Sequence, residues 1–129
     1  MSVGIVIVTH GDSGAHLLPV AEFILGEPLA RIGFVAFHQS GDRVTTVNEV
    51  RQALASADAG QGVLVLTDLI GSSPSNLVND LLEAHRGIMV TGLNLPMLMT
   101  VWNYRGEPLK PLAHRAVDAG RRGCKVFES

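Results

Sequence analysis

Four runs of apolar, mostly aliphatic residues divide the chain, and each is followed by a segment with apolar residues at helical spacing. The runs are residues 3–8, 32–37, 63–66 and 88–91. Uninterrupted apolar runs of this length predict strands that are buried on both faces, as in a parallel sheet. Strand and helix alternate four times, which predicts a three-layer α/β domain. It would contain a mainly parallel four-stranded sheet with helices on both faces.

Helix boundaries follow from residues that commonly cap helices. Asp12 or Ser13 is expected to cap the first helix, which should end near Gly26. Thr46 and Glu49 have the spacing of a capping box, which predicts the start of the second helix. The starts of the later helices are predicted from serine, asparagine and proline at Ser73–Pro74, Asn94–Pro96 and Pro108.

Length and composition favour one globular domain. The chain has 129 residues, 47% of them hydrophobic, so we expect a single domain over residues 1–129. The apolar end, Cys124–Phe127, is expected to form a short fifth strand. A net charge of −2 provides no electrostatic footprint for nucleic acid or an anionic membrane. The single cysteine excludes an internal disulfide, and neither a membrane helix nor a signal peptide is recognisable, so we expect a cytoplasmic protein.

Polar residues stand where the first and third apolar runs end. The first run ends in Thr9, His10 and Gly11, and the third is followed by Asp68 and the loop 71–74. In open α/β sheets, the carboxyl ends of the strands are where ligands bind. If the first and third strands are neighbours, roughly 4.8 Å apart, His10 and Asp68 can touch.

This combination predicts phosphoryl transfer through a phosphohistidine. A carboxylate bonded to one ring nitrogen of His10 fixes the imidazole tautomer, and the other nitrogen is then a directed nucleophile. Free amides at a glycine- and serine-rich helix start bind anions such as phosphate. We expect the phosphoryl oxygens to be held by Gly71, Ser72 and Ser73, with Thr9 or Gly11 as further candidates. This chemistry requires no metal and no organic cofactor.

Other chemistries find less support. There is no Walker sequence, no G-x-G-x-x-G after a strand and no G-x-S-x-G elbow. Residues 11–14 match the serine motif of chymotrypsin-like proteases, but those proteins are all-β and this chain alternates strand and helix. The five histidines are scattered without the spacing of a metal site. Of these, His38 follows the second strand on the same edge as His10, where a loop role is favoured over a role at the rim of the site.

In these respects the chain resembles the IIA domain of the mannose-type sugar phosphotransferase system. The resemblance runs in order across nearly the whole chain. Its pieces are residues 5–11, 17–18 with 21–22 and 25–26, 62–68, 71–76, 92–98 and 116–123. Two departures lie near the predicted site: Asp12 to Gly14 replace a bulkier apolar start, and Pro19 is unexpected in a helix.

The resemblance implies a function and a set of partners. His10 would be phosphorylated on Nε2 by the phosphocarrier HPr, Asp68 would hold the other ring nitrogen, and Ser73 would lie beside the phosphoryl group. A IIB domain would be the usual acceptor, and a membrane permease would be reached only indirectly. The resemblance also implies a homodimer in which the C-terminal strand, near residues 124–127, can be exchanged between subunits.

Two other functions fit the sequence. In the first, the phosphorylation state of His10 controls binding to a regulatory partner, without sugar transport. In the second, the chain is a small-ligand-binding α/β module in which His10 is incidental. The sequence names neither the sugar nor the acceptor.

Overall fold

The computed structural model describes residues 2–38, 41–69, 71 and 73–129. Strands and helices alternate through most of the chain, and a short 3₁₀ helix, η1 (Glu83–His85), precedes the last strand. The strands are β1 (Gly4–His10), β2 (Ile32–Phe37), β3 (Val63–Thr67) and β4 (Ile88–Val90). The helices are α1 (Ser13–Leu25), α2 (Arg43–Ala57), α3 (Ser73–Asn79), α4 (Leu95–Asn103) and α5 (Leu109–Arg122).

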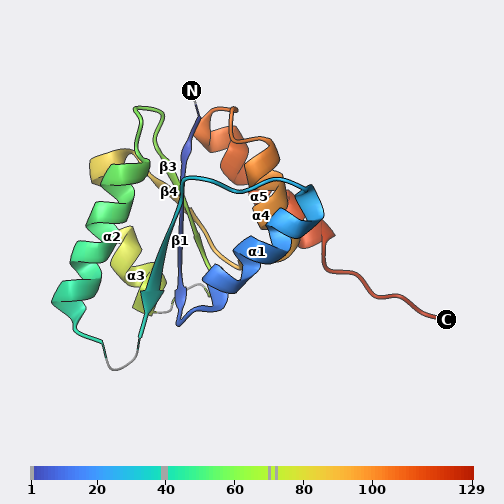
Figure 1. Ribbon diagram of the computed structural model, residues 1–129, viewed down its shortest axis with the longest axis horizontal. Helices are drawn as coiled ribbons and strands as arrows, with labels where there is room; N and C mark the ends of the chain where they lie inside the picture. The colour runs from blue at the N-terminus through green and yellow to red at the C-terminus, as the bar shows by residue number, and fades with distance from the viewer. Residues whose placement is uncertain (1, 39–40, 70, 72) are drawn as a thin grey trace.

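The strands form one parallel sheet in the order β2-β1-β3-β4. Helices α2 and α3 cover one face, and α1, α4 and α5 cover the other (Figure 1). The predicted three-layer α/β fold is therefore confirmed, with every strand pair parallel. The chain leaves β1 toward β2 on one side and later enters β3 on the other, so the sheet has its topological switch point between β1 and β3.

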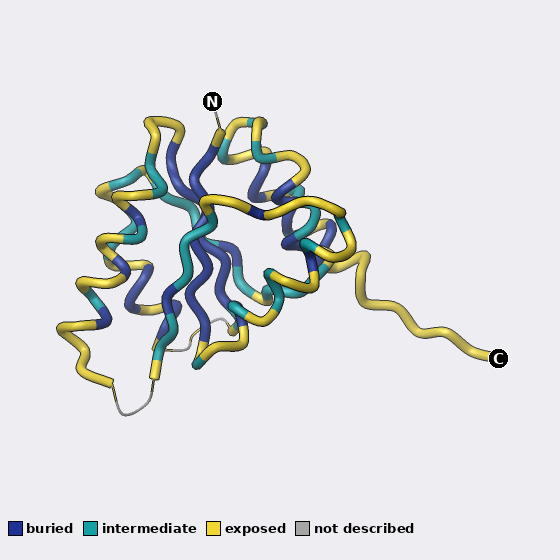
Figure 2. The backbone as a smooth tube through the Cα atoms, viewed as in Figure 1, coloured by how far each residue is buried: buried dark blue, intermediate teal, exposed yellow. Residues whose placement is uncertain are grey.

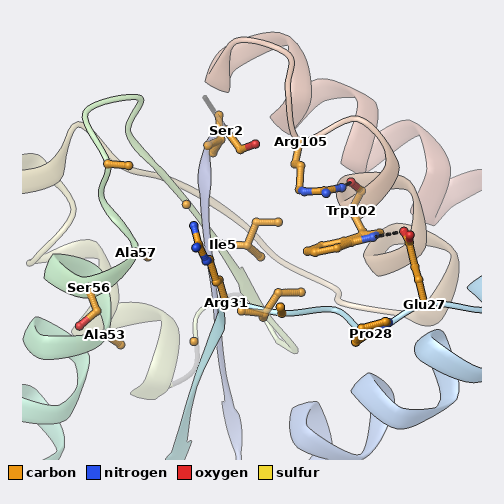
Figure 3. Close-up of a pocket in the computed structure, with 16 residues that line it drawn as sticks. Ser2, Ile5, Glu27, Pro28, Arg31, Ala53, Ser56, Ala57, Trp102 and Arg105 are labelled. Carbon is orange, nitrogen blue, oxygen red and sulfur yellow. Dashed lines mark hydrogen bonds between the residues drawn. The ribbon is translucent and has the colours of Figure 1, made fainter.

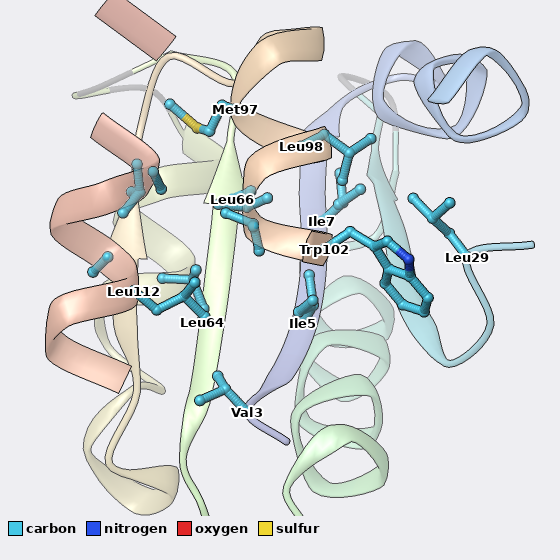
Figure 4. Packing of buried hydrophobic residues seen from close by; sticks show 14 of the residues in the cluster. Val3, Ile5, Ile7, Leu29, Leu64, Leu66, Met97, Leu98, Trp102 and Leu112 are labelled. Carbon is cyan, nitrogen blue, oxygen red and sulfur yellow. The ribbon is translucent and has the colours of Figure 1, made fainter. Parts of the chain in front are cut away.

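Two apolar cores lie on opposite faces of the sheet, because successive side chains of a strand point to opposite sides. Figure 2 shows the central strands as the most buried part of the chain. On one face Val6, Val8 and Val65 pack against α2 and α3. The other core includes Trp102 and is shown in Figure 4; its buried members from the sheet, α4 and α5 include Ile5, Ile7, Leu64, Leu66, Leu98 and Leu112.

Two predicted helix caps are wrong. Neither Asp12 nor Ser13 caps α1 with its side chain, and Ser13 Oγ instead donates to the His10 carbonyl oxygen. The second helix begins at Arg43, before the expected capping box, because Asp42 accepts from the Val44 amide and serves as its N-cap. In both places another side chain, that of Thr9 for α1 and that of Asp42 for α2, accepts from a backbone amide at the start of the helix. Residue spacing alone does not show which of several polar residues will do so.

Later helices follow the prediction more closely. Asn94 caps α4 by accepting from the Met97 amide, and Gly26 ends α1 in a left-handed conformation. Pro19 lies inside α1, as the sequence indicated. Helix α3 is shorter than expected and ends at Asn79, and α5 continues through a buried Gly120 to Arg122.

The expected strand at Cys124–Phe127 does not form within the single chain. Residues 124–129 have no regular secondary structure, are exposed and lead away from the domain (Figure 1). A strand is stable only when a neighbouring strand accepts its hydrogen bonds, and this segment contacts none. Exchange of this segment with a second copy stays a prediction.

Among the described residues, no helix is both long and apolar enough to cross a membrane.

Thr67 carries a buried hydroxyl that has no hydrogen-bond partner in the described part of the chain. An unsatisfied buried polar group costs about 1–3 kcal/mol. Thr67→Val keeps the shape and removes that group, so we expect it to raise the free energy of unfolding by about 1–2 kcal/mol. Urea denaturation measures this change. A loss of stability instead would indicate that the hydroxyl is satisfied by an ordered water.

Asp58 and His85 form a second histidine–aspartate pair, at the edge of the sheet opposite His10. The Gly60 amide donates to Asp58 Oδ1 (2.9 Å), and His85 Nδ1 lies 3.0 Å from Asp58 Oδ2. These hydrogen bonds, that of Gly60 first, hold the pKa of the Asp58 carboxyl below its ordinary value of 3.8.

A pKa that is lower in the folded chain predicts an acid-dependent loss of stability. The stabilisation is complete above the unfolded pKa and disappears as the pH falls through the lower folded pKa. Asp58→Asn should therefore flatten the decrease in unfolding free energy between about pH 5 and pH 2.5. Urea denaturation at several pH values tests this, and parallel curves for wild type and variant would contradict it.

Candidate functional site

The pairing of β1 with β3 brings His10 and Asp68 together at the carboxyl edge of the sheet. His10 is the last residue of β1, and Asp68 directly follows β3. His10 Nδ1 lies 3.1 Å from both carboxylate oxygens of Asp68, and the His10 backbone amide donates to Asp68 Oδ2 over 3.1 Å. The pair thus occupies the topological switch point, where open α/β sheets bind their ligands.

The geometry assigns different roles to the two ring nitrogens. A carboxylate only accepts hydrogen bonds, so Nδ1 of His10 must carry the proton that faces Asp68. Nε2 then holds a lone pair that is available to an electrophile. The His10 side chain is 48% exposed and that of Asp68 only 27%. The histidine is therefore accessible and the carboxylate that orients it is more protected.

Thr9 and Gly11 fix the loop that follows His10. The Thr9 side chain is buried, and its hydroxyl accepts from the Gly14 amide (3.0 Å), so this threonine caps the start of α1. A Cβ on Gly14 would lie 2.5 Å from Ile7 Cγ2, so only glycine permits this close approach. Gly11 adopts φ +53° and donates its amide to the Phe37 carbonyl oxygen over 2.8 Å.

These contacts change the expectation for Thr9 and Gly11. The Thr9 hydroxyl donates to the Gly11 carbonyl oxygen and accepts from α1, and the Gly11 amide is used by β2. Among the described residues, the Thr9 hydroxyl and the Gly11 amide are thus already engaged in contacts that position His10, and a direct role for either residue in holding the phosphoryl group stays a prediction.

The loop after Asp68 remains the candidate anion-binding segment. Gly71 is exposed and adopts φ +73°, and Ser73 is exposed at the first residue of α3. The expectation for Ser72 lies outside the described residues.

The remaining histidines lie apart from the pair. His38 is exposed just after β2, and His85 is held by Asp58. His16 and His114 are exposed on α1 and α5. Within the described ranges, no group of three or more histidine, cysteine, aspartate or glutamate side chains could hold a metal ion.

Sequence reasoning missed Phe37. Its ring meets that of His10 edge-on, with centroids 6.4 Å apart and an interplanar angle of 65°. Phe37 is the register partner of His10 across β1 and β2, so the contact depends on which strands are neighbours. An aromatic residue at the end of the second apolar run was the available signal.

Comparison with known proteins agrees, over most of the chain, with the family resemblance found in the sequence. A family model described as "PTS system fructose IIA component" matches residues 4–114. The mannose-specific EIIAB component of the phosphotransferase system (PTS) of Escherichia coli K12 is 32% identical over 132 residues, covering 100% of this chain and 41% of that protein. The chain thus spans about two fifths of the length of this curated relative.

Solved structures share the fold. The phosphotransferase component EIIA of Streptococcus agalactiae superposes with a TM-score of 0.80 at 28% identity, and 97% of each chain is covered. The mannose/sorbose-specific IIA subunit of Enterococcus faecalis superposes with a TM-score of 0.82 at 22% identity, covering 100% of this chain and 97% of that one. From the family match and the 32% identity, this chain belongs to the mannose-type IIA family of the phosphotransferase system.

Proposed function

We propose that this protein is a phosphohistidine carrier, which accepts a phosphoryl group from phospho-HPr on His10 and passes it to a IIB domain during sugar uptake. The observation that carries the proposal is the His10–Asp68 pair, whose 3.1 Å contacts engage Nδ1 of a half-exposed imidazole and leave Nε2 without a partner among the described residues. An exposed nucleophile suits a protein donor, because a docking partner can bring its own phosphoryl group to the surface. Family membership supports the same role.

The transfer balances without a cofactor. The Nε2 lone pair of His10 attacks the phosphorus in line, and the N–P bond of the donor breaks. The electron pair of that bond returns to the imidazole of HPr. The ring of His10 becomes cationic, and the Asp68 carboxylate, already bonded to Nδ1–H, stabilises that charge. Transfer to the acceptor reverses these steps on a histidine or other nucleophile of the IIB domain.

The start of α3 is the part of the site that would hold the phosphoryl oxygens. The first amides of a helix lack partners within the helix and carry a partial positive charge. Gly71, Ser72 and Ser73 would supply such donors, and the Ser73 hydroxyl would add another. Gly71, which lies between Asp68 and α3 in the sequence, has a left-handed backbone that glycine adopts without strain.

A homodimer belongs to this proposal. Val126 and Phe127 at the end of the chain are 86% and 91% exposed, and Phe23 on α1 is 88% exposed. Apolar side chains with this exposure are typical of surfaces that associate. The C-terminal segment would pair with a second copy, and the reaction would take place in the cytoplasm.

The proposal is tested by phosphoryl transfer from labelled phosphoenolpyruvate through enzyme I and HPr to this protein. We expect an acid-labile, alkali-stable label, which is discharged when a mannose-type IIB protein is added. No label on this protein, with HPr shown to be charged, would contradict the carrier function. A label that no IIB protein removes would support the regulatory alternative.

A further inference from the structure

A hollow of about 1080 Å³ lies at the amino edge of the sheet, at the end opposite His10. Its walls come from the starts of β1 and β2, the last turn of α2, and Trp102 and Arg105 at the end of α4 and just after it (Figure 3). The length of β1, about 20 Å at the usual rise per residue, separates this hollow from the proposed phosphoryl site. The proposed function therefore makes no use of it.

Arg31 is the cation that the hollow leaves unpaired. The residue is exposed, and its guanidinium has no hydrogen-bond or ion-pair partner among the described residues. Its backbone is left-handed, with φ +68°, a conformation that glycine or asparagine adopts more readily than arginine. Strained positions of this kind concentrate at functional sites. An arginine is thus held, against its backbone preference, at the edge of a hollow.

A second guanidinium is fixed beside Trp102. Arg105 stacks over the indole ring, 3.6 Å from its centroid, and donates to the Trp102 carbonyl oxygen over 2.7 Å. The carboxylate of Glu27, which also lines the hollow, accepts from Trp102 Nε1 over 2.7 Å (Figure 3). The Glu27 carboxylate keeps its charge, but the Trp102 hydrogen bond fixes one of its oxygens against the indole. Among the described residues, Arg31 has no hydrogen-bond acceptor, and Arg105 donates only to the Trp102 carbonyl oxygen.

The other walls provide hydrogen-bond acceptors and apolar contacts. The last turn of α2, including Ser56 and Ala57, lines the hollow with groups near the carbonyl end of that helix. The Leu54 carbonyl oxygen accepts from the Asp58 amide, whereas the later carbonyl oxygens of a helix end lack partners within the helix and can accept from hydroxyl groups. Ile5, Ile32 and Pro28 provide aliphatic surface.

We propose that this hollow binds a small polyol that carries a phosphate or carboxylate group. Arg31 binds the anionic group through its guanidinium fork, which matches either oxyanion. The hydroxyls donate to the end of α2, and the carbon skeleton contacts the aliphatic wall. This is a second ligand site, separate in space and chemistry from His10.

The sole tryptophan of the chain lines this hollow, so its fluorescence reports binding directly. The probes are glucose 6-phosphate and gluconate. Glucose, which lacks the anionic group, and inorganic phosphate, which lacks the polyol, are the controls that represent the two halves of glucose 6-phosphate. We expect saturable changes with glucose 6-phosphate, gluconate or both, and much weaker ones with either half. The response to the two anions shows which oxyanion the site prefers. No saturable change with either anion up to about 10 mM would overturn the proposal, since a weaker site would gain under about 3 kcal/mol.

Variants separate binding from folding. Arg31→Gly removes the side chain and relieves the backbone strain, so the variant should fold at least as stably as the wild type and weaken binding at least about tenfold. Arg122→Ala, an exposed arginine at the end of α5, is the matched control and should bind as the wild type does. Unchanged affinity in Arg31→Gly would contradict the proposal. His10→Gln should bind normally, so failure of the phosphocarrier function and failure of this site are distinguishable.

Discussion

His10→Gln should abolish phosphorylation of this protein by phospho-HPr, lowering the rate by at least about 10³-fold. Glutamine is polar and of similar reach, and it retains no ring nitrogen with a nucleophilic lone pair. The backbone amide at position 10 can still donate to Asp68, and the side chain is half-exposed, so little stability should be lost. The measurement is the initial rate of label transfer at fixed phospho-HPr.

His38→Gln is the control for this variant. His38 is exposed just after β2, at the same edge of the sheet as His10. We expect it to be labelled at the wild-type rate. Labelling of His10→Gln at wild-type stoichiometry would remove His10 as the acceptor, and loss of labelling in His38→Gln would assign it to the site.

Asp68→Asn should slow phosphorylation of His10 by about 10²- to 10⁴-fold while leaving the fold intact. An asparagine amide can present an N–H group to Nδ1, which favours the tautomer with the proton on Nε2. That tautomer has no lone pair at the position that faces the donor. The negative charge that stabilises the cationic ring is lost as well. The transfer rate measures this effect, and the thermal unfolding temperature checks the fold.

Asp58→Asn is a matched control, because it alters the other histidine–aspartate pair of the chain. That pair has a similar contact, 3.0 Å between His85 Nδ1 and Asp58 Oδ2, and lies at the opposite edge of the sheet. We expect its transfer rate to equal that of the wild type. If Asp58→Asn and Asp68→Asn slowed transfer equally, the effect would be general and Asp68 would have no special role.

The order of elements could be predicted because each strand is a local signal. The apolar runs are uninterrupted, and in the structure every residue from Val63 to Thr67 is buried, as is every residue from Gly4 to Thr9. Helix starts were less predictable. Thr9, near the end of β1, caps α1, and Asp42 caps α2 from a position before the predicted capping box. Several polar residues near each helix start could have served as the cap, so the sequence did not single out the right one.

The sequence by itself determined the fold class and the two residues of the candidate site, whose role in phosphoryl transfer stays a prediction. Parallel strands place their carboxyl ends on one edge, so a histidine and an aspartate that each follow a buried strand had to share that edge. Tertiary structure decided the rest. The order β2-β1-β3-β4 made β1 and β3 neighbours, which closed the His10–Asp68 contact and placed Phe37 against His10. Which strands become neighbours depends on packing across the whole sheet, and a local sequence pattern carries no information about that packing.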